Sequence, residues 1–144
     1  MARDPLRVLL RLHGLALDMA RRRLADRLRC EAAAIARSAA IATEIVQETA
    51  AQAAQPELAA APDSYAAWLG RMRGERSATQ ETVRVAAEAS AEARASVQEE
   101  RVATRALEAV QAEARERRDR VTARDEQRVV DEVALRGGGR RWSG

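Results

Sequence analysis

Apolar and small side chains recur along the first third of the chain at alternating spacings of four and three residues. This pattern is typical of a helix that packs along one face. The first positions of this heptad seam are Leu6, Leu10, His13, Leu17, Ala20 and Leu24. An extra four-residue step at Leu28 predicts a shift of register. After it, the expected seam continues through Ala32, Ile35, Ala39, Ala42 and Val46. With Asp4 as N-cap and Pro5 at the first helical position, a helix is predicted over about residues 5–54.

A break and a second helical pattern follow. Pro56 and Pro62 stop a helix, so residues 55–63 are expected to form the turn. The segment 62–64 (Pro-Asp-Ser) then provides a new N-cap signal. The second seam is predicted at Tyr65, Leu69, Met72, Arg76, Thr79, Val83, Ala86, Ser90, Ala93 and Val97, and again around Leu107, Val110, Ala114 and Val121. A helix over about residues 64–136 results, ended by three glycines and followed by a tail to residue 144.

These elements predict an all-α fold in one domain: an antiparallel coiled-coil hairpin whose second helix is the longer. Composition agrees, because 34 of the 144 residues are Ala and 25 are Arg. Leu, Ile, Val and Phe together make up about 18% of the chain, which is too little for a large rounded core. An Ala-rich seam buries little surface, so the hairpin is expected to be marginally stable and helped by a partner.

Charge is distributed unevenly. Residues 1–30 hold eight arginines and three acidic residues, so this segment is basic. Residues 31–99 hold six arginines and ten acidic residues and are acidic, whereas residues 100–144 hold eleven arginines and nine acidic residues and are weakly basic. In a hairpin, both basic segments would lie at one end and the acidic stretch at the other. Unlike ends suit contact with two different partners.

Several kinds of chemistry are disfavoured. One Cys (Cys30) and one His (His13) allow no disulfide framework and no His-based metal cluster, so we expect no metal, no cofactor and no enzymatic activity. His13 is interpreted as a packed seam residue and Cys30 as a small buried or half-buried thiol. No apolar run is long enough for a membrane span, and no signal peptide is expected.

The Arg-rich first helix leaves alternatives open. Arg21, Arg22 and Arg23 crowd one turn, which is compatible with an ordinary solvated face or with a protein-docking surface. Nucleic-acid binding is disfavoured because Asp18 and Asp26 interleave and no stacking aromatics accompany them. Residues 6–17 could also lie on an anionic membrane, but their heptad register favours a helix partner. A general helical scaffold therefore remains an alternative, as does an Arg-rich peripheral binder of membrane or nucleic acid.

Two short runs resemble a known family. The ending E-Q-x-x-x-D-E-x-A of the FliJ family is similar to the run Glu126-Gln127-Arg128-Val129-Val130-Asp131-Glu132-Val133-Ala134. The second helix of that family opens with the pattern Y-x-x-aromatic-apolar, which resembles Tyr65-Ala66-Ala67-Trp68-Leu69. The family comprises small coiled-coil proteins of the flagellar type III export apparatus. Length and two-helix organisation agree, whereas the Ala-richness and the Gly/Arg tail depart from the family pattern.

The resemblance implies a non-enzymatic cytoplasmic protein at the inner face of the membrane export apparatus. Its expected partners are the hexameric export ATPase, the cytoplasmic domain of the membrane export gate, and export chaperones. By resemblance, the gate-binding face maps onto Trp68, Met72, Glu75 and Thr79, with Ile45 on the first helix. The residues expected to contact the ATPase ring are Arg21, Arg22, Arg124, Arg128, Asp131 and Glu132.

Overall fold

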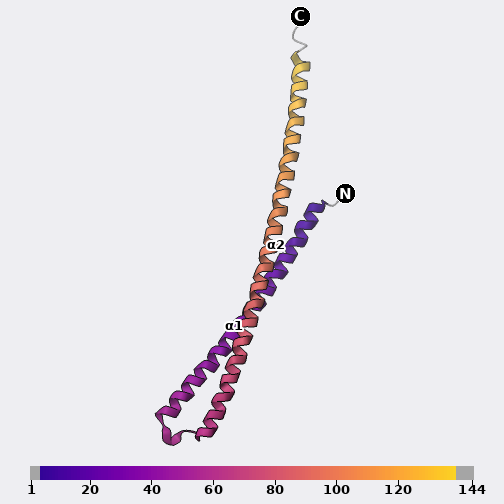
Figure 1. Cartoon of the computed structure of the whole chain (residues 1–144). Helices are drawn as coiled ribbons and strands as arrows, with labels where there is room; N and C mark the ends of the chain where they lie inside the picture. The colour runs from indigo at the N-terminus through magenta and orange to yellow at the C-terminus, as the bar shows by residue number, and fades with distance from the viewer. Residues whose placement is uncertain (1–3, 139–144) are drawn as a thin grey trace. The chain divides into compact units, whose positions relative to one another are not determined.

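The computed structural model describes residues 4–138 and places nearly all of them in two long helices. Helix α1 spans Pro5–Ala54, the short 3-10 helix η1 spans Pro56–Leu58, and helix α2 spans Pro62–Gly138 (Figure 1). Residues 4–138 contain no strand. The fold is therefore all-α, and a helical hairpin with the longer second helix is confirmed. The tail residues Arg140, Arg141 and Trp142 lie outside the described residues.

The chain divides into two compact units. One spans Leu15–Glu100, and among the described residues the other combines residues 4–14 with residues 101–138. We call them the turn unit and the terminal unit.

The start of α1 follows from its capping residue. The Leu6 N–H donates a hydrogen bond to the Asp4 carboxylate at 3.1 Å, and the Asp4 carbonyl accepts from Arg7 and Val8. Asp4 therefore acts as the N-cap, which leaves Pro5 at the first helical position, where its missing N–H costs nothing.

The turn is short because prolines end one helix and begin the next. Pro56 begins η1, and the Ala59 N–H donates to its carbonyl. Helix α2 begins at Pro62, two residues earlier than expected: the Tyr65 N–H donates to the Ala61 carbonyl at 3.0 Å. Ala61 is thus the N-cap residue and Pro62 occupies the first helical position, which its fixed φ suits. Helix α2 also ends two residues later than expected, at Gly138.

In the turn unit the two helices run antiparallel and side by side (Figure 1). Two contacts between residues far apart in sequence fix this pairing: Ser90 bonds to Glu31, and Tyr65 bonds to Thr49. The buried side chains are few, as the composition predicts. They are Ala20, Ile41, Met72, Ser90 and Val97.

The structure corrects the predicted register in the second half of α1. Leu28, Ile35 and Val46 are exposed, by 37%, 50% and 68%. The original heptad instead continues without a shift, and its buried or half-buried positions are Leu17, Ala20, Leu24, Glu31, Ala34, Ser38, Ile41, Ile45, Glu48 and Gln52. We call this set the hairpin seam of α1. An uninterrupted heptad keeps one face toward the partner helix, and polar contacts accommodate its charged members: Glu31 accepts from Ser90, and Glu48 from Gln52.

The predicted seam of α2 agrees with the burial over most of its length. In the turn unit all its positions from Tyr65 to Val97 are buried or half-buried except Arg76, which is exposed. In the terminal unit Leu107 and Ala114 are half-buried, but Val110 and Val121 are more than half exposed. From residue 115 to residue 138 every residue is exposed. This end of α2 is therefore exposed to solvent on every face of the helix.

Candidate functional site

The aromatic residues at the start of α2 form a small cluster beside the turn. The rings of Tyr65 and Trp68 stack with centroids 5.8 Å apart and planes 23° apart. The Tyr65 hydroxyl and the Thr49 hydroxyl are 2.8 Å apart, which ties α2 to the last turns of α1. Tyr65 and Trp68 are both half-buried. The stack leaves part of the Trp68 indole open, which suits a contact anchor.

The five residues expected to contact the gate differ in accessibility. Met72 is only 8% exposed and belongs to the core of the turn unit. Trp68, Thr79 and Ile45 are half-buried, and Glu75 is exposed. Met72 and Thr79 are one heptad apart in the middle of the seam, whereas Trp68 and Glu75 are one heptad apart at its edge. A partner that leaves the hairpin closed can therefore touch Trp68 and Glu75, but it cannot cover Met72.

The residues expected to contact the ATPase ring are all exposed and lie in both units. In the turn unit, Arg21 pairs with Asp18 at 3.7 Å, with more than half of each side chain exposed. Arg22 is exposed on the same turn of α1. Because these side chains are solvated, their ion pairs contribute little to stability and are available to a partner.

The other ring candidates lie on the fully exposed end of α2. Arg124, Arg128 and Asp131 follow each other at spacings of four and three residues, so they share one helix face. Asp131 accepts a hydrogen bond from the Gln127 amide at 2.8 Å. Glu132 pairs with Arg136 at 2.8 Å. These contacts offset the unfavourable position of two acids near a helix C-terminus.

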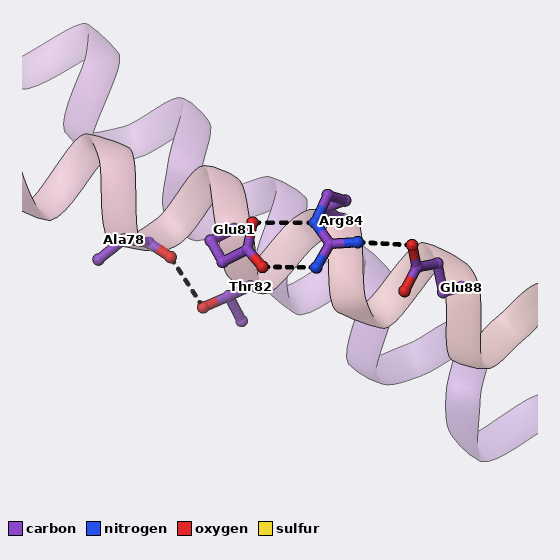
Figure 2. Close-up of polar contacts among 5 residues, drawn as sticks. All are labelled: Ala78, Glu81, Thr82, Arg84 and Glu88. Carbon is purple, nitrogen blue, oxygen red and sulfur yellow. Dashed lines mark hydrogen bonds and ion pairs between the residues drawn. The ribbon is translucent and has the colours of Figure 1, made fainter.

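A guanidinium held between two carboxylates on the outer face of α2 was not predicted. Arg84 contacts both oxygens of Glu81, at 2.9 Å and 2.6 Å, and one oxygen of Glu88 at 2.5 Å (Figure 2). The hydrogen bonds that Arg84 donates to the Glu81 carboxylate lower the pKa of Glu81 and raise the pKa of Arg84. The i,i+3 and i,i+4 spacings would have indicated this cluster. All three side chains are more than half exposed, so these ion pairs contribute little to stability.

A groove between the helices of the turn unit was also missed. It has a volume of about 140 Å³ and is lined by Ala20, Arg23, Arg27, Ala89, Glu92, Ala93 and Ser96. Arg23 and Arg27 stand four residues apart on α1, above small side chains of α2. Glu92 lines the same groove. Because its carboxylate would repel an anion, the two arginines do not make the groove an anion-binding site.

The described residues offer little reactive chemistry. Cys30 is a free thiol and is exposed, which corrects the expectation of a buried or half-buried one. His13 is half-buried, as a seam residue should be. Residues 4–138 hold no group of three or more His, Cys, Asp or Glu side chains that could bind a metal ion. Within the same residues, neither helix contains a stretch apolar and long enough to cross a membrane.

The comparison with protein families finds a match that covers nearly the whole chain. The family model described as "Flagellar FliJ protein" matches residues 1–143. Among curated proteins and among solved structures, nothing matched the chain.

Proposed function

The chain belongs to the FliJ family of flagellar proteins, and from this premise we propose that it couples the hexameric export ATPase to the membrane export gate as a non-enzymatic stalk. The family implies a component of the flagellar export apparatus. The observation that carries the assignment is the family match over residues 1–143. The proposed location is the cytoplasmic face of the membrane, and assistance to export chaperones is part of the proposal.

The exposed end of α2 supports the ring contact. A helix with all of residues 115–138 exposed gains nothing from tertiary packing, which supplies most of the stability of helices in proteins. Val129, Val130 and Val133 are each at least 60% exposed there, beside Arg128. A partner that covers this segment would bury apolar surface and meet the charges on the Arg124–Asp131 face. An asymmetric stalk bound in a ring can favour particular subunit states by differential binding.

ATP turnover by the purified export ATPase tests the ring contact. Wild-type protein should raise turnover, whereas Arg124→Glu combined with Arg128→Glu, or Arg21→Glu combined with Arg22→Glu, should lose most of the increase. A matched control reverses Arg71 and Arg73, two exposed arginines near the turn, which changes net charge by the same amount. No increase with wild-type protein, or a full increase with both test variants, would contradict the proposal.

The gate contact is proposed for the edge formed by Trp68 and Glu75, with the accessible parts of Thr79 and Ile45. Trp68 is supported by its stacked and half-buried ring, since Trp is a favoured interface anchor. Titration calorimetry with the cytoplasmic domain of the gate should show weaker binding for Trp68→Ala and for Glu75→Lys. Val85→Ala, an exposed apolar position on the same helix, serves as the control and should bind like wild type. Circular dichroism must show equal helicity for all variants, because a loss of helicity would assign Trp68 to the core.

A further inference from the structure

Four arginines lie on one face of the exposed end of α2, and we call them the arginine row. The members of the row are Arg117, Arg120, Arg124 and Arg128. Spacings of three, four and four residues place them within a sector of about 80° around the helix, and all four are exposed. The acidic residues between the first and the last arginine, and next to them, lie outside that sector: Glu116, Asp119, Asp125 and Glu126.

The row lowers the stability of the helix that carries it. Arg124 stands four residues after Arg120 and four before Arg128, and like charges at this spacing destabilise a helix. The helix macrodipole does not compensate, because it favours cations in the last turn, which begins about two turns beyond Arg128. Tertiary packing does not compensate either, since residues 115–138 are all exposed. Opposite charges on a partner would remove the repulsion.

Two members of the row have carboxylate partners and two do not. Arg117 and Arg120 each pair with a glutamate four residues earlier, at 2.9 Å for Arg117. The side chains of Arg124 and Arg128 form no hydrogen bond or ion pair with any residue that the structure describes. In both existing pairs more than 60% of each side chain is exposed, so these pairs are weak and can exchange for the carboxylates of a partner.

The surroundings of the row favour an acidic protein surface over a phosphate backbone. Residues 115–131 hold six arginines and five acidic residues, a net charge of +1, which is too small to attract many phosphates. The same segment has no aromatic side chain that could stack on bases. Val121 and Leu135 border the row and are 56% and 78% exposed. A protein surface can cover these apolar side chains while its carboxylates meet the arginines.

We propose that the arginine row binds an acidic surface of a protein partner, with Arg117 and Arg120 acting together with Arg124 and Arg128. The guanidinium groups donate hydrogen bonds to Asp or Glu carboxylates of that surface. This inference rests on the proposed ring contact and names its chemistry: the part of the export ATPase that meets this face of α2 is acidic.

The affinity for the purified export ATPase tests the row. Arg117→Gln combined with Arg120→Gln should weaken binding about threefold or more, and added salt should weaken wild-type binding more than binding of this variant. The matched control is Arg115→Gln combined with Arg118→Gln, which removes the same charge from exposed positions outside the row. The control should bind like wild type. Equal affinities of the two variants would overturn the arginine row, whereas no binding by the wild-type chain would contradict the proposed function as well.

A double-stranded DNA oligonucleotide tests the other class of anionic partner. At physiological salt the wild-type chain should bind the oligonucleotide much more weakly than it binds the ATPase. Binding of equal strength that Arg117→Gln with Arg120→Gln abolishes would assign the row to phosphates and would overturn the proposal.

Zero-length cross-linking tests which face meets the carboxylates. The chain contains no lysine, so one introduced lysine supplies a unique side-chain amine, which a carbodiimide joins to a carboxylate in contact with it. Arg124→Lys keeps the charge and has no acidic residue three or four positions away. Arg118→Lys shares both properties but lies about 120° away around the helix, so it is the matched control.

Mass spectrometry of the complex with the ATPase locates the cross-link. Arg124→Lys should give an amide bond between the new lysine and an Asp or Glu of the ATPase, and Arg118→Lys should give little. Equal cross-linking by both variants would overturn the proposal, as would a complex that forms with Arg124→Lys but gives no cross-link at the new lysine.

Discussion

The hydroxyl of Ser90 on α2 donates a hydrogen bond to the carboxylate of Glu31 on α1, with 2.6 Å between the two oxygens. Ser90 is 0% exposed, and it is the largest fully buried side chain among the described residues. Its small size lets the helices approach closely at this point, and Glu31 occupies a seam position there. A single polar pair at seam positions can fix the register of a coiled coil. The Glu31–Ser90 bond thus joins one seam position of α1 to one seam position of α2.

Replacing Ser90 tests this role. Ser90→Ala removes the donor and leaves the Glu31 carboxylate without its partner in the seam, which should lower the free energy of unfolding by about 1–2 kcal/mol. Urea denaturation followed by circular dichroism measures the change. Ser96→Ala is the matched control, because the Ser96 hydroxyl donates only to a carbonyl of its own helix, that of Glu92. If both variants lose the same stability, the Glu31–Ser90 bond does not stabilise the hairpin.

Two glycines near the start of α2 are expected to weaken it. A Cβ built on Gly70 or on Gly74 meets no atom within 4 Å, so alanine fits at both positions. Because Gly in a helix interior costs roughly 0.5–1 kcal/mol relative to Ala, each Gly→Ala change should stabilise the turn unit by that amount. Thermal unfolding should show a higher midpoint for each variant and a larger rise for the pair. A lower midpoint would mean that these positions need the freedom of glycine.

Met72 and Trp68 should respond differently to truncation. Met72→Ala empties a core position and should reduce the free energy of unfolding by about 2 kcal/mol or more. Trp68→Ala removes a half-buried side chain at the edge of the seam. It should reduce the free energy of unfolding less than Met72→Ala does, but it should weaken binding to the gate more. Measuring both quantities for both variants separates the core from the contact surface. A larger loss of stability from Trp68→Ala than from Met72→Ala would contradict this assignment.

The ion pair between Arg84 and Glu81 should make the stability of the protein fall when the solution becomes acidic. The folded pKa of Glu81 is lowered below its ordinary value of 4.5. Its contribution is therefore present above about pH 4.5 and is lost as the pH falls toward the folded pKa. The midpoint difference between wild type and Glu81→Gln should be small at pH 7, because the pair is solvated, and should vanish once the pH is below the folded pKa. An equal difference at both pH values would mean that the Arg84–Glu81 pair does not contribute to stability.

The sequence predicts the helices well because strong local signals mark them. Asp4 and Pro5 define the start of α1, and Pro56 and Pro62 define the break. The α2 seam was also predicted, since its larger members, such as Met72 and Val97, coincide with the buried positions. Helix caps, proline breaks and large apolar seam residues are each recognised from residues close together in the sequence.

The register of α1 after Leu28 was predicted wrongly for a physical reason. The larger side chains Ile35 and Val46 outweighed Glu31 and Ser38 in the pattern, but the hairpin buries the face that matches Ser90. Which of two adjacent faces is buried depends on the partner helix, and periodicity within one helix does not contain that information. Met72 was predicted both on the α2 seam and on the gate-contact face, and its exposure of only 8% agrees with the seam position.

The central claim, a role in flagellar protein export, is tested most directly by the amount of flagellar protein that cells secrete when they lack this chain. Export should fall several-fold in the deletion strain and should recover with the wild-type chain. It should recover poorly with the Trp68→Ala/Glu75→Lys variant at equal cellular level. Unchanged secretion and swimming in the deletion strain would contradict the account.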